Sequence, residues 1–243
     1  MNTANAAVVS RPVDGVPPYT RLRFHFSLPA GAALPPWPGS AWRGAFGWAL
    51  RELVCLTGQD QCGGCLLASE CLYQRLFETA VAAAGQGVTT HAPHPFVLFV
   101  PDAGRGRRSR DGAVIELTLI GEACAALPLV VRALQRAGEG GIAGRRNRLR
   151  LWSVSQWHGG RWEPVLRPGW NALRRLDPEP LDSFPPYPGG ALRVQLCSPL
   201  RIKHQGRLVG PDAFSPRIFV HALYVRLRRL CQFHGRPSVS SWP

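Results

Sequence analysis

The sequence has little lysine and few acidic residues. Only one of its 29 basic residues is a lysine, Lys203, and 15 acidic residues leave a formal net charge of +14. A basic excess of this size attracts polyanions and makes their binding dependent on salt. Arginine adds forked phosphate contacts and stacking on bases, which an ammonium group lacks. The composition therefore predicts a nucleic-acid-binding protein, against the alternative of a solvated basic surface that only maintains solubility.

Several other features are missing, and each absence excludes a class of protein. No apolar run reaches the roughly 18 residues that a membrane span requires, and the N-terminus lacks the pattern of a signal peptide. We therefore expect a cytoplasmic protein without a membrane partner. No GKT or GKS follows a glycine loop, which argues against a nucleoside triphosphate site. No acidic cluster suggests a nuclease that works with two metal ions.

The first half of the chain alternates strand and helix patterns. Residues 19–28 alternate strictly, with Leu22, Phe24 and Phe26 on one face and basic residues on the other, as in a half-buried strand. A helical period then runs over 40–56, with Ser40 as the expected N-cap. Its apolar stripe is predicted to hold Trp42, Phe46, Ala49, Leu53 and Leu56, with Gly44, Gly47, Trp48 and Arg51 opposite. Two glycines on an exposed helix face cost stability, so we expect a neighbouring group to approach the backbone closely there.

Further elements complete a six-element order. Short strands are expected at 94–100 and 113–121, a helix at 125–137 and a strand at 148–155. The order β-α-β-β-α-β is that of a ferredoxin-like fold. A second unit is expected to begin with a strand over 192–197, followed by a hairpin at 205–206 and a helix over 215–233. The chain ends before this unit could repeat the full order.

These patterns predict an α+β protein with a ferredoxin-like first domain and an abbreviated second unit. Residues 1–18 are expected to be a flexible tail. The first domain covers 19–155 and includes a cysteine-rich insertion at 55–71. A link over 156–190 then leads to the second domain at 191–243.

The cysteine-rich insertion carries a candidate metal site. Its inner pair is spaced C-x2-C, which places two thiolates for one zinc ion, and two further thiols can complete a tetrahedron. The four candidate ligands are Cys55, Cys62, Cys65 and Cys71. The alternative is that these thiols pack as small apolar groups or form a disulfide. In either case we expect a structural role.

Arginine-rich segments are the candidates for nucleic-acid contacts. Two lie in glycine-rich loops, and a third is a stripe on the last predicted helix. Together with Arg51, the predicted RNA-binding residues are Arg105, Arg107, Arg108, Arg110, Arg145, Arg146, Arg148, Arg150, Arg217, His221, Tyr224 and Arg228. The alternative for each group is a solvated run of charge.

The motifs, taken in order, resemble one family. They are PGSAWRGAFGWALREL, the four cysteines with LYQRLFE, HAPHPFVL, ELTLIG with ALPLVVRALQRAG, GGIAGRRNRLRLWSV, and CSPLRIKHQGRLV. This series is similar to the CRISPR-associated RAMP superfamily, and within it to the endoribonucleases that process precursor CRISPR RNA. The resemblance implies tandem ferredoxin-like folds, binding to a CRISPR repeat hairpin, retention of the product, and other subunits of a CRISPR complex as partners. Family members often continue into a glycine-rich loop near the C-terminus, so the chain here resembles a compact variant, such as one of type IV.

The resemblance also implies a reaction. Members of this family cleave RNA without a metal cofactor: the 2′-hydroxyl attacks the phosphate and leaves a 2′,3′-cyclic phosphate. Such a reaction needs a base, an acid and positive charge at the phosphate. His25 can serve as acid or base, Arg21 and Arg23 share its face, Arg43 can join them, and Tyr19 can orient the 2′-hydroxyl.

Three functions follow in order of preference. The first is a metal-independent endoribonuclease that matures CRISPR RNA. The second is a non-catalytic RNA-binding subunit of a CRISPR ribonucleoprotein, which the abbreviated C-terminus favours. The third is a zinc-dependent DNA-binding regulator, which depends on the cysteines and the charge alone.

Overall fold

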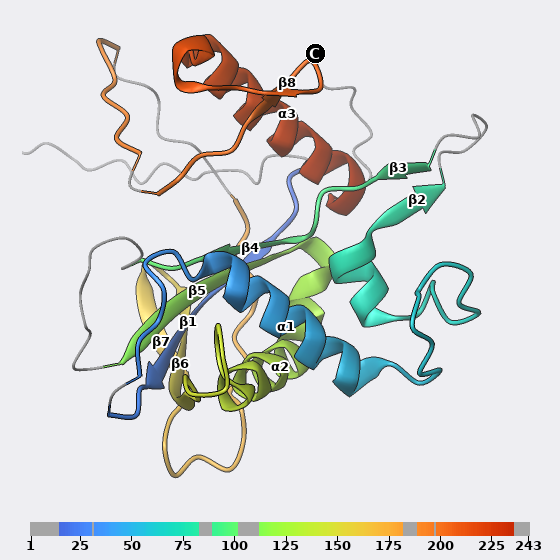
Figure 1. The fold of residues 1–243 in the computed structure, drawn as a ribbon, viewed down its shortest axis with the longest axis vertical. Helices are drawn as coiled ribbons and strands as arrows, with labels where there is room; N and C mark the ends of the chain where they lie inside the picture. The colour runs from blue at the N-terminus through green and yellow to red at the C-terminus, as the bar shows by residue number, and fades with distance from the viewer. Residues whose placement is uncertain are drawn as a thin grey trace, which may run out of the picture.

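The structure is a computed structural model that describes residues 15–30, 32–82, 89–101, 112–181, 189–196 and 198–235. It has an α+β architecture (Figure 1). In chain order the elements are β1 (Tyr19–Ser27), α1 (Gly39–Val54), η1 (Gln74–Glu78), β2 (Ala80–Ala82), β3 (Thr89–His91), β4 (Phe96–Phe99), β5 (Ala113–Ile120), η2 (Gly121–Ala126), α2 (Leu127–Gly140), β6 (Arg150–His158), β7 (Arg161–Leu166), β8 (Lys203–His204), β9 (Arg207–Leu208), η3 (Pro211–Ala213) and α3 (Pro216–His234). The six elements predicted in the first half are all present, with η1, β2 and β3 inserted between α1 and β4.

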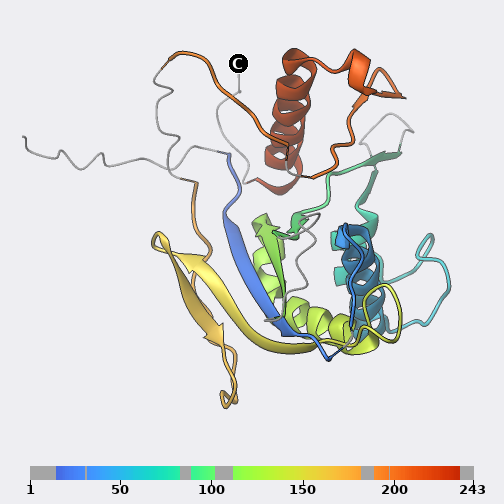
Figure 2. The ribbon, with the colours of Figure 1, turned by 60° about the vertical axis from the view of Figure 1, so that its left-hand side comes forward.

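The central feature is an antiparallel five-stranded sheet in the order β4-β5-β1-β6-β7. β1 is the middle strand and pairs with β5 on one side and β6 on the other. In Figure 2, α1 and α2 lie on the same side of this sheet, and α3 lies beyond the end at which β1 begins. The opposite face of the sheet is therefore left without a covering helix among the described residues.

The core lies between the sheet and the two helices. The alternation predicted for β1 is confirmed, because Leu22, Phe24 and Phe26 are almost completely buried. Phe26 packs against Trp42 of α1, with ring centroids 4.8 Å apart. Gly138 of α2 lies so close that an added Cβ would be 2.8 Å from the Phe26 ring. This close packing fixes which residues of β1 point away from the helices.

The details of α1 differ from the prediction. The N-cap position is Pro38, without a side-chain cap, so Ser40 lies inside the helix. Leu56 lies beyond the helix and is 86% exposed. Gly47 is buried rather than open, since an added Cβ would be 3.0 Å from the Phe77 ring. The close approach expected at the two glycines is confirmed at Gly47, where Phe77 of η1 packs against the helix, but not at Gly44, which has nothing within 4 Å.

The region predicted as a link contains more structure than expected. β6 continues to His158, and β7 then adds a fifth strand to the sheet. The chain returns to β1, where Tyr19 and Glu179 pair through two backbone hydrogen bonds of 2.9 and 2.7 Å. This return closes the first structural unit at about residue 179, well after the predicted boundary at 155.

The C-terminal region holds a short hairpin, β8–β9, at the predicted place and a single long helix, α3. The strand predicted over 192–197 is wrong, because 191–196 have no strand pairing and Cys197 lies outside the described residues. Leu192, Val194 and Leu196 are 75%, 62% and 49% exposed. No second ferredoxin-like sheet is present in the described part of this region. Among the described helices, none is long and apolar enough to cross a membrane.

Candidate nucleic-acid interface

The open face of the sheet carries the basic residues of β1. Arg21, Arg23 and His25 alternate with the buried core residues of the same strand, so all three point away from the helices. They lie on the central strand, with β5 and β6 as neighbours. Tyr19, at the start of β1, alternates onto the same face, so the structure places four of the five predicted catalytic residues on one side of the sheet.

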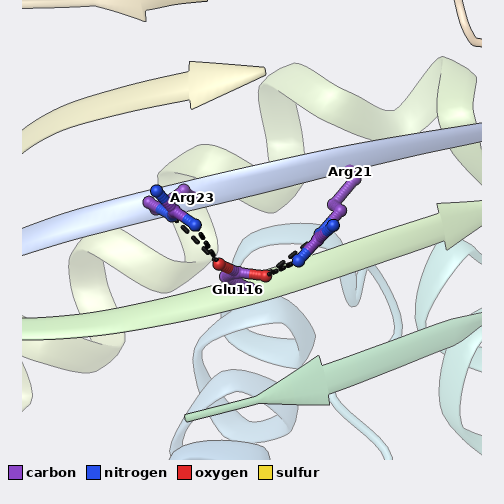
Figure 3. A network of polar contacts seen from close by, with 3 residues as sticks. All are labelled: Arg21, Arg23 and Glu116. Carbon is purple, nitrogen blue, oxygen red and sulfur yellow. Dashed lines mark hydrogen bonds and ion pairs between the residues drawn. The ribbon is translucent and has the colours of Figure 1, made fainter. Parts of the chain in front are cut away.

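Arg21 and Arg23 share one carboxylate. Glu116 of β5 lies opposite Arg23 in the strand register. Arg21 donates Nε and Nη2 to Glu116 Oε2 at 3.0 and 2.6 Å, and Arg23 donates the same atoms to Oε1 at 2.9 and 2.6 Å (Figure 3). Each carboxylate oxygen thus accepts from one guanidinium fork, so one carboxylate holds both arginines and the three side chains carry a net charge of +1.

The environment of Glu116 favours its ionised form. Its side chain is 5% exposed, whereas those of Arg21 and Arg23 are 42% and 32% exposed. Burial by itself raises the pKa of Glu116, but the hydrogen bonds from the two arginines outweigh it and lower the pKa. The carboxylate is therefore charged at neutral pH and fixes both guanidinium groups from below.

An indole lies beside the arginine pair. Cζ of Arg23 is 4.0 Å from the centroid of the Trp162 ring, and Cζ of Arg21 is 5.2 Å from it. Trp157 meets the same ring edge to face at 5.4 Å. Such a surface of arginine and aromatic rings offers both phosphate contacts and stacking area to a single-stranded nucleic acid.

His25 and Tyr19 flank this pair along β1. His25 is half-buried, and burial followed by the charge of Arg23 lowers its pKa. The imidazole is therefore neutral at pH 7 and able to accept a proton. Tyr19 is at the other end of the strand, where its backbone pairs with Glu179.

The loop between α2 and β6 presents the second group of predicted arginines. Asn147 holds this loop, donating Nδ2 to the Ile142 oxygen at 3.0 Å and accepting at Oδ1 from the Ala33 backbone. The backbone turns tightly at Gly141, where φ is 99° and an added Cβ would be 2.6 Å from a backbone oxygen. Arg145, Arg146, Arg148 and Arg150 are all exposed. Arg145, Arg146 and Arg148 are thus placed on an anchored loop, and Arg150 is the first residue of β6.

The other predicted arginine loop, with Arg105, Arg107, Arg108 and Arg110, lies outside the described residues. On α3, the predicted stripe is exposed along its length, at Arg217, His221, Tyr224 and Arg228. This stripe belongs to the C-terminal helix and not to the sheet face.

Two predicted residues of α1 lie elsewhere. Arg43 does not join Arg21 and Arg23, because its guanidinium lies over Phe96 and Phe77 on the helix side of the sheet. Arg51 donates Nη2 to the backbone oxygens of Gln59 and Asp60, the latter at 2.9 Å. Arg51 thus holds the cysteine-rich loop of its own chain.

The four cysteines do not form a metal centre in the described structure. No group of three or more potential ligands converges among the described residues, although Thr57 Oγ1 lies 3.9 Å from Cys55 Sγ and 3.7 Å from Cys65 Sγ. Hydrogen bonds, first from the Gly58 backbone, lower the pKa of Cys55. The described thiols lie in one loop region but do not converge on a single metal position.

Sequence reasoning missed Glu116 and Trp162. The signal for Glu116 was a single acidic residue within an otherwise apolar strand. Trp162 was missed because it was assigned to a link rather than a strand. Both depend on strand register, which a single sequence does not reveal.

Comparisons with known proteins match the first structural unit. The AF_1859_N family, described as an N-terminal domain, matches residues 16–179, which is more than half of the chain. An uncharacterized protein of Archaeoglobus fulgidus is 28% identical over 123 residues, covering 51% of this chain and 41% of that protein. No solved structure matches. The matched region ends at Glu179, the residue whose backbone pairs with β1.

Proposed function

Since the chain belongs to the AF_1859_N family through its N-terminal domain, we propose a function from the geometry of that domain: a metal-independent endoribonuclease of the CRISPR-associated RAMP type. It would cleave CRISPR repeat RNA and keep the product hairpin bound. The observation that carries the proposal is the open sheet face on which Arg21 and Arg23 are fixed beside Trp162 and His25.

The fold supports this proposal. The order β4-β5-β1-β6 with α1 and α2 on one face is compatible with a ferredoxin-like domain. The hairpin β8–β9 and α3 would then represent an abbreviated second domain. RNA-binding domains of this general shape use the open sheet face for single-stranded RNA, with aromatic side chains stacking on bases.

The chemistry follows from the residues on that face. His25, neutral at pH 7, accepts the proton of the 2′-hydroxyl as the 2′-oxygen bonds to phosphorus. The bond from phosphorus to the 5′-oxygen breaks, and this oxygen leaves as a hydroxyl after taking a proton from water or from the protonated His25. Arg23, held by Glu116, presents its remaining N–H groups to the phosphate, where negative charge builds up in the transition state. Arg21 adds a second charge, and Tyr19 lies at the end of the same strand. The net charge of +14 brings the RNA to this surface.

The test is to incubate the protein with labelled CRISPR repeat RNA in excess EDTA. We expect cleavage with a 2′,3′-cyclic phosphate at the new 3′ end. His25→Ala and Arg23→Gln should reduce cleavage strongly while RNA binding is largely retained. The control is Arg132→Gln, which removes an exposed arginine from α2. Absence of cleavage, or cleavage that needs a divalent ion, contradicts an endoribonuclease of this type.

One observation favours a second candidate, a non-catalytic RNA-binding subunit of a CRISPR ribonucleoprotein. Glu116 already occupies one fork of each arginine, which leaves one net charge for the phosphorane. This function predicts tight repeat binding with the RNA left intact. The exposed apolar stripe of α3, with Val220 62%, Leu223 55% and Leu227 39% exposed, supports protein partners in such an assembly.

A structural zinc ion at Cys55, Cys62, Cys65 and Cys71 remains a prediction, and with it the third candidate, a zinc-dependent DNA-binding regulator. The described thiols do not converge, so no step of the reaction is assigned to a metal. Metal analysis of the purified protein tests the zinc site. One zinc ion per chain that is lost in Cys62→Ser supports the site, and a stable protein that contains no metal contradicts it. Preference for duplex DNA over hairpin RNA would favour the regulator.

A further inference from the structure

A second group of basic side chains lies away from the sheet face, where α1, the start of β4 and α3 meet. Arg43 of α1 lies against two aromatic rings, with Cζ 5.1 Å from the Phe96 centroid and 5.3 Å from that of Phe77. The His94 ring is 6.0 Å from the Phe96 ring. Arg226 of α3 donates Nη2 to the backbone oxygen of His94 at 3.4 Å. Arg43 and the His94 ring therefore lie against the same Phe96 ring, and Arg226 reaches the His94 backbone from a segment far along the chain.

This cluster lacks a matching negative charge. No carboxylate of the described residues forms an ion pair with Arg43 or Arg226. Burial lowers the pKa of Arg43, and burial followed by Arg229 and Arg43 lowers that of Arg226. Glu78 is the acidic group that acts on His94, and it has the weakest influence there. Arg43 is half-buried, whereas Arg226 is exposed. The cost of keeping an unpaired cation from water therefore falls mainly on Arg43, and an anion that joined the two arginines would also remove their repulsion.

The hydrogen bonds of His94 define which of its nitrogens is basic. Nδ1 lies 3.1 Å from the backbone oxygen of Leu76, which can only accept, so Nδ1 carries a hydrogen. Nε2 is then the basic atom of the neutral ring. Burial first, and then Arg43, lowers the pKa of His94; Arg226 lowers it further, while the Leu76 carbonyl and Glu78 raise it. His94 is therefore neutral at pH 7, with Nε2 able to take a proton.

We propose that Arg43, His94 and Arg226 form a binding site for one phosphate group of the RNA, separate from the sheet face. Guanidinium groups offer forked N–H donors to phosphate oxygens, and the rings of Phe77 and Phe96 support Arg43 from behind. Because Arg226 belongs to α3, a bound phosphate would also tie this helix to the first structural unit. The proposal depends on the proposed function for its ligand, an RNA phosphodiester; inorganic phosphate has the same chemistry and is tested separately.

The site predicts that RNA binding is linked to protonation. A bound phosphate opposes the effect of the two arginines on His94 and so raises its pKa in the complex. Binding then takes up a proton, and affinity increases as the pH falls from about 8 to about 6. Arginine does not titrate in this range. A phosphate site made of arginines alone would lack this contribution.

The test is fluorescence anisotropy with a short labelled single-stranded RNA. Arg43→Gln and Arg226→Gln should each weaken binding about fivefold to tenfold relative to Arg132→Gln, which removes the same charge from α2. The double variant should lose less than the product of the single losses, because both side chains contact one phosphate. His94→Gln should flatten the pH dependence between about pH 6 and about pH 8. Losses equal to that of the control, or fully additive losses with unchanged pH dependence, overturn the proposal.

A second measurement separates failure of this site from failure of the proposed function. Thermal unfolding of the same variants is followed with and without inorganic phosphate. If phosphate raises the Tm of wild type and Arg132→Gln more than that of Arg43→Gln, the anion site is supported. If RNA does not bind in the same experiments, the site stands as an anion site, and RNA is overturned as its ligand. If phosphate raises all Tm values equally and RNA binding does not distinguish the variants, no anion site exists at these residues.

Discussion

Replacing Glu116 with glutamine tests the arrangement on which the interface depends. The carboxylate accepts four N–H groups, two from Arg21 and two from Arg23, and its side chain is 5% exposed. The amide of glutamine can accept from one arginine, but its NH2 group then faces the other. The substitution keeps the size of the side chain and removes one fork, so it isolates the electrostatic contribution.

The expected cost in folding free energy follows from the exposure of the partners. Breaking a fully buried ion pair from one side costs about 3–5 kcal/mol. Here the side chains of Arg21 and Arg23 are 42% and 32% exposed, so water can replace part of the hydrogen bonding that they lose when the Glu116 carboxylate is removed. We therefore expect a loss of about 2–3 kcal/mol, near the range for charged hydrogen bonds. With an ordinary urea dependence, this lowers the unfolding midpoint by about 1 M.

The sign of the pH dependence gives a second readout. The pKa of Glu116 is lowered in the folded state by its two arginines, so its contribution is present above the unfolded pKa of about 4.3 and is lost as the pH falls through the lower folded value. The difference between wild type and Glu116→Gln should be large at neutral pH and shrink below about pH 4.

Urea unfolding, followed by circular dichroism, measures both effects. The control is Glu139→Gln, an exposed carboxylate whose partner is Gln135, with an expected change within about 0.5 kcal/mol. Glu116→Gln also adds one net positive charge to the sheet face. The slope of log affinity against log salt should then steepen by about 0.7 for single-stranded RNA. A stability equal to that of the control refutes the role of Glu116, and an unchanged slope refutes RNA binding over this face.

Three further predictions concern other parts of the fold. Gly47→Ala should destabilise the protein by about 1–3 kcal/mol, because the added Cβ would lie 3.0 Å from the Phe77 ring. Gly44→Ala should stabilise it by about 0.5–1 kcal/mol, because nothing lies within 4 Å of the added Cβ and alanine favours the helix. Urea unfolding of both variants measures the two changes. Trp162→Ala should weaken single-stranded RNA binding by about 1–3 kcal/mol in anisotropy titrations. His25 should titrate below about 6.5 in NMR, because burial and an adjacent arginine lower its pKa.

The sequence predicted the elements of the first unit because each has a clear hydrophobic period. In β1 the alternation alone decided which side chains are buried, and the structure confirms that face. At Gly47 the sequence indicated a close approach to the helix but not the group that makes it, which is Phe77 of η1. Alternation is also present at 192–196, but none of the described strands pairs with these residues. Local pattern specifies a face, and only tertiary contacts specify what covers it.

The same distinction applies to the arginines, which a charge count treats as equivalent. Arg51 is bound to backbone oxygens of its own loop, and Arg21 and Arg23 share one buried carboxylate. In contrast, neither Arg43 nor Arg226 has an acidic partner among the described residues. Arg43 is half-buried, and Arg226 is exposed where it contacts the His94 backbone. The cost of holding an unpaired cation out of water is recovered only when an anion binds. Many described arginines have no acidic partner, but Arg43 is the most informative of them because it is half-buried, and Arg226 follows because, after burial and Arg229, the charge of Arg43 lowers its pKa.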